Sequence, residues 1–239
     1  MLLHRLLIVI SLLALPLASR ADIAIHTTRL VHQGSERMVS QRIWNQGDKP
    51  SLIQAWIDDG DREQPASARG LPFFAMPPLF QLEPGLNRDV SVRLVDARAL
   101  PTDREALYWL NILDLPASEK AADRLNIAYA VRWRIKLFHR PAGLAGTPAA
   151  APAQLAWRRQ EGEEGTRLLA RNDSPYHVSL QSMSVDGKDI DLPVDNAVIR
   201  PYSEWSLPMA GPLRAGRTPL KMVWLDDTGK AQDLEAQID

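Results

Sequence analysis

Apolar and polar residues alternate along one long stretch of the chain, residues 125–141. Every odd position of residues 125–135 is apolar, whereas the even positions are small or polar and become basic from Arg132 onward. A repeat of two residues is typical of a β-strand. Pro141 ends the pattern, because proline cannot donate a hydrogen bond to a neighbouring strand. The stretch therefore predicts one strand with a tightly specified register.

Two interpretations of this strand remain open from the pattern alone. In the first, the odd-numbered face lies in the core of a β-sandwich and the basic even-numbered face lies in water. In the second, the strand is an edge strand whose odd-numbered side chains, about 6.6 Å apart, are offered to the sheet of another protein. In that case Lys136, near the end of the strand, would be available to hold an anion.

Shorter strand patterns precede this stretch. Residues 22–30 alternate loosely and predict a first strand, with Arg29 where that strand leaves regular pairing. The acidic residues at 58–61 lack the ligand spacing and the closing Glu of a calcium loop, so they predict a solvated turn. Further strands are expected at residues 38–44, 51–58, 90–95 and 108–115.

The second half of the chain has its own strand patterns. Residues 144–152 are rich in alanine, glycine and proline, a composition typical of a linker. Beyond them, short strand patterns alternate with turn signals, which favours a second, smaller β-sandwich. We therefore expect an all-β protein with domains at residues 22–143 and 153–239. The strands of the second domain are expected at residues 154–158, 166–172, 177–185 and 220–225.

The first 21 residues predict a cleavable signal peptide. A positively charged start is followed by an apolar run, residues 6–17, that is too short to span a bilayer. Small residues then stand where a signal peptidase reads, and cleavage after Ala21 would make Asp22 the mature N-terminus. The alternative is an uncleaved anchor. Export is the interpretation that this pattern favours.

Composition excludes several classes of function. The net charge of −1, with mixed signs, provides no basic footprint for nucleic acid, and a hydrophobic share of 45% fits a globular protein. There is no cysteine, so disulfides and thiol chemistry are excluded. The five histidines show no metal-ligand spacing, and no phosphate-binding loop, GxSxG or HExxH motif occurs. We expect no enzyme activity, no metal, no cofactor and no nucleotide.

Four short blocks resemble one known family and occur in that family's order. They are residues 28–31 (TRLV), 77–85 (PPLFQLEPG), 100–111 (LPTDREALYWLN) and 134–141 (RIKLFHRP). The last block looks like the signature strand of the periplasmic chaperones that assemble pili and fimbriae by the chaperone–usher route. This resemblance implies two immunoglobulin-like β-sandwich domains set at an angle with a cleft between them.

The resemblance also implies a function. Such a chaperone binds, folds and caps pilus or fimbrial subunits in the periplasm by donor-strand complementation, and delivers them to an outer-membrane usher. Arg29 and Lys136 stand at the positions that bind the C-terminal carboxylate of a subunit. The implied donor strand carries Leu125, Ile127, Tyr129 and Val131, of which Tyr129 replaces a more usual aliphatic residue. Glu105, Arg140 and Asp227 match a charged cluster between the domains, although Asp226 is an alternative to Asp227.

The residues leave rival interpretations. A secreted β-sandwich that binds carbohydrate, or that forms part of a fibre, would need exposed aromatic platforms, whereas most tryptophans lie in strand-like apolar segments. A periplasmic hydrolase would need a Ser/His/Asp site assembled from distant residues. For the chaperone interpretation, an exposed apolar edge would favour self-association of the free protein.

Overall fold

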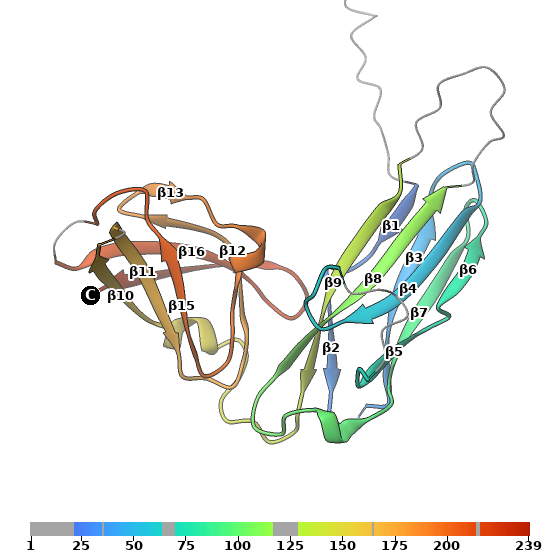
Figure 1. Ribbon diagram of the computed structural model, residues 1–239, viewed down its shortest axis with the longest axis horizontal. Helices are drawn as coiled ribbons and strands as arrows, with labels where there is room; N and C mark the ends of the chain where they lie inside the picture. Colours follow the sequence, from blue (N-terminus) through green and yellow to red (C-terminus); the bar gives the residue numbers. More distant parts are fainter. Residues whose placement is uncertain (1–21, 35, 64–69, 117–128, 164, 214–215) are drawn as a thin grey trace, which may run out of the picture.

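Two β-sandwiches follow one another along the chain and are set at an angle (Figure 1). The structure, a computed structural model, describes residues 22–34, 36–63, 70–116, 129–163, 165–213 and 216–239. Within these ranges, no helix has the length and apolar character needed to cross a membrane. The expected all-β architecture of two immunoglobulin-like domains is confirmed.

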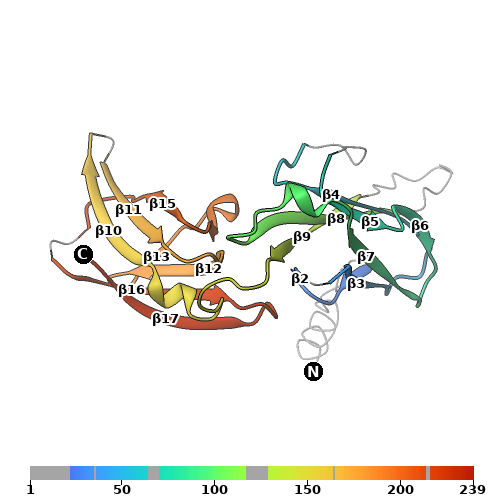
Figure 2. The ribbon, with the colours of Figure 1, turned by 90° about the horizontal axis from the view of Figure 1, so that it is seen from below.

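The first sandwich packs a four-stranded sheet, in the order β1-β3-β7-β5, against a five-stranded sheet, in the order β2-β9-β8-β4-β6. In Figure 2, β2 and β9 lie on the side of this sandwich that faces the second one. The strands are β1 (Ile23–Ile25), β2 (Arg29–Gln33), β3 (Met38–Asn45), β4 (Ser51–Asp58), β5 (Phe73–Met76), β6 (Leu79–Leu82), β7 (Asn87–Leu94), β8 (Ala106–Pro116) and β9 (Val131–Arg140), with a short 3-10 helix η1 (Ala97–Ala99) before β8.

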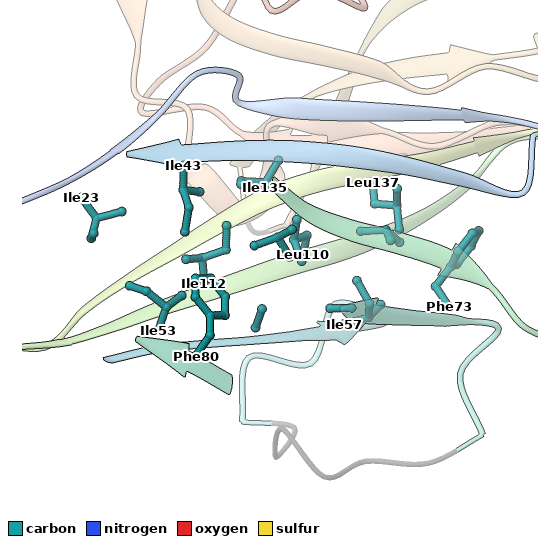
Figure 3. Close-up of a cluster of buried hydrophobic side chains, with 14 of the residues drawn as sticks. Ile23, Ile43, Ile53, Ile57, Phe73, Phe80, Leu110, Ile112, Ile135 and Leu137 are labelled. Atoms are coloured by element: carbon teal, nitrogen blue, oxygen red, sulfur yellow. The ribbon is translucent and has the colours of Figure 1, made fainter. Parts of the chain in front are cut away.

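Alternate residues of the two sheets form the core of the first sandwich. Ile53, Leu110 and Ile112 of the five-stranded sheet are fully buried between the layers. Figure 3 shows that Ile135 and Leu137 of β9 lie in the same cluster. The odd-numbered face of β9 at Ile135 and Leu137, which we call its lower part, therefore belongs to the protein's own core. Side chains two residues apart point to the same side of a strand.

The prediction of one continuous first strand, residues 22–30, was wrong. The segment forms two strands in different sheets: β1 pairs antiparallel with β3, and β2 pairs parallel with β9. The chain crosses between the sheets at residues 26–28, where the Thr27 hydroxyl donates to the side-chain oxygen of Gln41 at 2.6 Å. This crossing ends with Arg29 as the first residue of β2.

The second sandwich packs a sheet in the order β10-β11-β15 against one in the order β13-β12-β16-β17, with β14 paired to β12. Its core contains Trp157 and Trp205, whose rings meet edge to face at 5.9 Å. The elements are η2 (Ala151–Gln154), β10 (Ala156–Gly162), β11 (Gly165–Asn172), β12 (Val178–Val185), β13 (Lys188–Ile190), η3 (Val194–Asn196), β14 (Val198–Ile199), β15 (Ser203–Pro208), β16 (Thr218–Leu225) and β17 (Ala231–Ile238).

The segment between the sandwiches lies against the second one. Leu144 packs on the second core, Ala151 is buried within it, and the Tyr176 hydroxyl donates to the carbonyl of Gly146 at 3.1 Å. These contacts fall inside residues 144–152, the predicted linker. The domain boundaries at residues 143 and 153 stay predictions.

The core position of β9 generates a stability prediction. Leu137→Ala should lower the free energy of unfolding of the first sandwich by about 2–5 kcal/mol, because Leu137 is fully buried and its truncation leaves a cavity. Leu52→Ala, at a side chain that is 42% exposed, is the matched control and should change it by about 0.5 kcal/mol or less. Urea unfolding measures both. Equal midpoints for the two variants would contradict the placement of Leu137 in the core.

Candidate functional site

Two basic residues meet in the cleft between the sandwiches. The parallel register of β2 and β9 places Arg29 directly beside Lys136. The guanidinium of Arg29 donates to the carbonyl oxygen of Leu225 at 2.9 Å, and the ammonium of Lys136 lies 3.5 Å from the hydroxyl of Ser179. Both acceptors belong to the second sandwich. The two side chains therefore reach across from one domain to the other.

Both members of this basic pair are at least partly buried, and the nearby carboxylates of Asp227 and Asp226 favour the charge of Arg29. Arg29 is 5% exposed, its Nε has no hydrogen-bond partner, and within the described residues neither cation forms an ion pair. Burial, and then the neighbouring charge of Arg29, lower the pKa of Lys136 to about 8. Burial also lowers the pKa of Arg29. Two adjacent cations removed from water are costly without an anion, so this part of the cleft is suited to binding one.

A turn of the second sandwich forms the opposite wall. The carboxylate of Asp226 accepts hydrogen bonds from the backbone and hydroxyl of Thr228 and from the backbone N–H of Lys230. These bonds, the Thr228 side chain first, lower the pKa of Asp226 to about 2. Gly229 follows with φ +83°, and a Cβ there would lie 2.9 Å from the hydroxyl of Thr28. The turn can approach Thr28, next to Arg29, this closely because glycine occupies that position.

A charged cluster joins the domains beside this turn. Arg140 donates through Nε to Glu105 at 2.6 Å, and through both terminal nitrogens to Asp227 at 2.7 and 2.8 Å. Asp226 is not the partner, because its oxygens are engaged within the turn and by Gln232. The structure thus brings together the three residues predicted for the interdomain cluster.

Glu105 connects this cluster to a second segment of the other domain. Its carboxylate, whose side chain is 2% exposed, accepts the backbone N–H of His177 at 2.8 Å, and its own N–H donates to the carbonyl of Pro175 at 2.9 Å. Burial lowers the pKa of His177, and Nδ1 of its ring lies 3.3 Å from the same carboxylate. Burial disfavours the charge of Arg140, but its ion pairs with Asp227 and Glu105 outweigh this effect and raise the pKa of Arg140. The cluster is well suited to hold the domains at one angle.

The upper half of β9 has an open edge. β8 pairs with β9 from Val131 to His139, whereas β2 pairs only with residues 136–140. In the described part of the chain, no strand pairs with residues 131–135 on the side opposite β8. A strand edge of this kind presents unpaired backbone donors and acceptors to any extended segment.

The predicted donor residues are only partly described. Leu125 and Ile127 lie outside the described residues, and β9 begins at Val131, after Tyr129 and Ala130, which are not in a strand. Tyr129 precedes the strand and is 73% exposed, and Val131 is 37% exposed. The odd-numbered face therefore divides: its lower part, with Ile135, is core, and its upper part is open to solvent. The core interpretation holds for Ile135, and for the exposed residues the interpretation as a strand offered to a partner stays a prediction.

The prediction of a solvated turn at residues 58–61 was wrong for Asp58. Its carboxylate is fully buried and accepts hydrogen bonds from Arg134 at 2.6 Å and from the amide of Asn111 at 2.7 Å. The expectation that the basic face of the long strand lies in water fails for the same reason. The basic positions were visible in the sequence, but their partner on β4 lies across β8 and becomes apparent only from the order of strands.

The fold and the cleft define a class: a two-domain immunoglobulin-like protein with a basic pair in its cleft and one strand edge left open. The model of the N-terminal domain of the PapD pili and flagellar-assembly chaperones matches residues 22–145, and that of the PapD C-terminal domain matches residues 150–236. The chain belongs to the pilus assembly chaperone family.

Relatives agree with this assignment. The chain is 33% identical over 198 residues to the probable fimbrial chaperone YadV of Escherichia coli K12, with 82% of this chain and 80% of the relative covered. It is 31% identical to the chaperone protein FimB/FhaD of Bordetella pertussis, with 92% and 90% covered. The crystal structure of the YadV chaperone superimposes with a TM-score of 0.75 at 30% identity, and the match covers 91% of this chain and 100% of that one. The crystal structure of the Pseudomonas aeruginosa CupB2 chaperone superimposes with a TM-score of 0.74 at 28% identity, and the match covers 90% of this chain and 100% of that one.

The charged cluster generates the next prediction. Arg140→Ala should lower the free energy of unfolding by about 3–5 kcal/mol, because it leaves the buried carboxylate of Glu105 without its cation. It should also broaden the distribution of interdomain angles, measured by small-angle X-ray scattering. Arg158→Ala removes an exposed ion pair with Glu204 and is the control, with an expected change of about 0–1 kcal/mol. Scattering curves that stay identical after loss of Arg140 would contradict a role in setting the angle.

Proposed function

We propose that this protein captures the C-terminal segment of a pilus subunit in its cleft and completes the subunit's fold with its own strand. The observation that carries the proposal is the pair Arg29 and Lys136, two desolvated cations that form no direct ion pair among the described residues and that lie where the open edge of β9 begins. Family membership supports the same conclusion.

The basic pair would bind the subunit's terminal carboxylate. A carboxylate only accepts hydrogen bonds, and the guanidinium of Arg29 and the ammonium of Lys136 supply charge-assisted donors. The Nε of Arg29 is one donor that has no hydrogen-bond partner in the described part of the chain. Fixing the last residue of the subunit would also fix the register of every residue before it.

The bound segment would extend along residues 131–135 of β9. A chain that ends at Lys136 and runs back toward Val131 is parallel to β9, as β2 is below it. The row of exposed side chains, Val131 and Tyr129, would enter the subunit's incomplete core, and we propose that Leu125 and Ile127 continue this row. Each large side chain that becomes buried contributes about 1.5–3 kcal/mol, so burial supplies most of the affinity and the charges supply alignment.

We place this activity in the periplasm, reached by a signal peptide at residues 1–21, with an outer-membrane usher receiving the loaded subunit. Release needs no nucleotide if the next subunit's extension replaces the donor strand by better packing. The free protein would shield its apolar edge by self-association. The carbohydrate-binding alternative has less support, because Trp157 and Trp205 are packed in the second core rather than exposed as platforms.

Loss of either cation tests the anchor. Arg29→Ala and Lys136→Ala should each abolish copurification of a small subunit with the chaperone from periplasm, while circular dichroism shows a folded protein. Arg37→Ala, at an exposed cation of the same domain, is the control and should retain the subunit at one to one. Capture that survives both cleft substitutions would refute the carboxylate anchor.

The lowered pKa of Lys136, about 8, gives a pH dependence. Affinity for a subunit should be constant from pH 6 to 7 and should fall about tenfold by pH 9, because Lys136 of the free protein loses its proton while a bound carboxylate would keep it charged. Lys136→Arg keeps the charge and should bind with an affinity that does not change over this range. Calorimetric titration at several pH values measures both proteins; parallel pH profiles would contradict the role of Lys136.

A further inference from the structure

One buried carboxylate, that of Asp58, accepts hydrogen bonds from side chains of β8 and β9. Asp58, at the end of β4, accepts hydrogen bonds from Gly60 N–H, from Asn111 on β8, and from Arg132 and Arg134 on β9, at 2.8, 2.7, 3.4 and 2.6 Å. Asn111 in turn accepts from Nε of Arg132 at 2.8 Å. Both Asp58 and Asn111 are fully buried. We call Asp58, Asn111, Arg132 and Arg134 the Asp58 clamp.

The two arginines of the clamp lean away from the open edge. The guanidinium of Arg132 lies 4.9 Å from the ring centre of Trp56 on β4, and that of Arg134 lies 4.6 Å from the ring centre of Trp109 on β8. β4 and β8 are the strands on the closed side of β9. The clamp therefore attaches the upper half of β9 from behind and leaves its other edge accessible.

We propose that Asp58 is a positioning residue for subunit capture: through Arg132 and Arg134 it holds residues 131–135 of β9 in the extended form that a subunit strand adds to. This inference rests on the proposed function for its consequence, but not for its structural part. Asp58 itself would touch no subunit, because its side chain is fully buried.

Residues 131–135 of β9 pair with one strand only in the described chain, which explains why the Asp58 clamp is needed to hold them. Residues 136–140 have a strand on each side, whereas residues 131–135 have β8 alone in the described chain. A segment paired on one side opens more readily than one paired on both. Any mobility of residues 131–135 would have to be lost on binding, and a segment that is already ordered binds more tightly because it loses less conformational entropy.

Stability alone does not account for the clamp. Burying a carboxylate with two guanidiniums removes three charged groups from water, and replacing such a group by apolar residues is often neutral or stabilising. What an ion network does supply is one geometry, because donors and acceptors fit in one arrangement. The position of the Asp58 clamp, directly behind the open edge, matches that use.

The test is hydrogen exchange of the full mature chain with Asp58→Asn. The backbone amides of residues 131–135 and of the β8 residues paired with them should exchange at least about tenfold faster than in the unchanged protein. The amides of residues 136–140 and of the second sandwich should keep their exchange rates. Affinity for the subunit that copurifies with the unchanged protein should fall about tenfold. Asp89→Asn is the control: it removes an exposed carboxylate that is bound by Arg42 at 2.7 and 2.8 Å on the other sheet of the same sandwich.

Each outcome decides the proposal. Unchanged exchange at residues 131–135, faster exchange without loss of affinity, or an equal effect of Asp89→Asn would overturn it. If Asp58→Asn does not fold, Arg132→Gln replaces it, because Arg134 still pairs with Asp58 in that variant. We then expect faster exchange at residues 131–133 and weaker capture of the subunit. Unchanged exchange rates in this variant would overturn the proposal. Exchange is measured without a subunit, so failure of the proposed function, seen as no capture by the unchanged protein, is distinguishable from failure of the clamp.

Discussion

The parallel pairing of β2 with the lower half of β9 is the constraint on which the cleft depends. In a parallel pair, residues that lie side by side point to the same face, so Arg29 and Lys136 are brought together without any turn between them. β2 has five residues and begins at Arg29, because the chain before it belongs to the other sheet. The same arrangement that joins the two cations therefore leaves residues 131–135 with no paired strand on that side among the described residues.

The even-numbered side chains of β9 point to one face of the sheet and make different contacts along the strand. Arg132 and Arg134 belong to the Asp58 clamp, Lys136 lies in the cleft, and Arg140 bonds to Glu105 and to the second domain. These groups are spaced along one rigid strand, so the distance from the clamp to the basic pair and to the domain junction is set by backbone geometry. A shift of β9 by one residue would move all of them to the core side at once.

Local pattern and resemblance together predicted the all-β class, the two sandwiches and the positions of the basic pair and the charged cluster. Pattern failed where strand order decides the outcome. The division of residues 22–30 between two sheets depends on partners in β3 and β9, and the burial of Asp58 depends on side chains that cross β8. β17 was missed because this edge strand carries few large apolar residues, so its alternation is weak in the sequence. These features follow from contacts between distant segments, which periodicity does not register.

The odd-numbered face of β9 is continuous from the protein's own core to its open end. Ile135 and Leu137 are packed between two sheets and cannot move without leaving a cavity, so they fix the direction in which Val131 projects. A subunit strand paired with residues 131–135 would lie beside this row, and Val131 and Tyr129 would enter the subunit's core. The chaperone's core and the subunit's core would then share one strand. Affinity that comes from burial alone is indifferent to register, since a slip of two residues places similar side chains at the same places. In the proposed complex, the two cations at one end of the row would remove that ambiguity, because a terminal carboxylate would reach them in one register only.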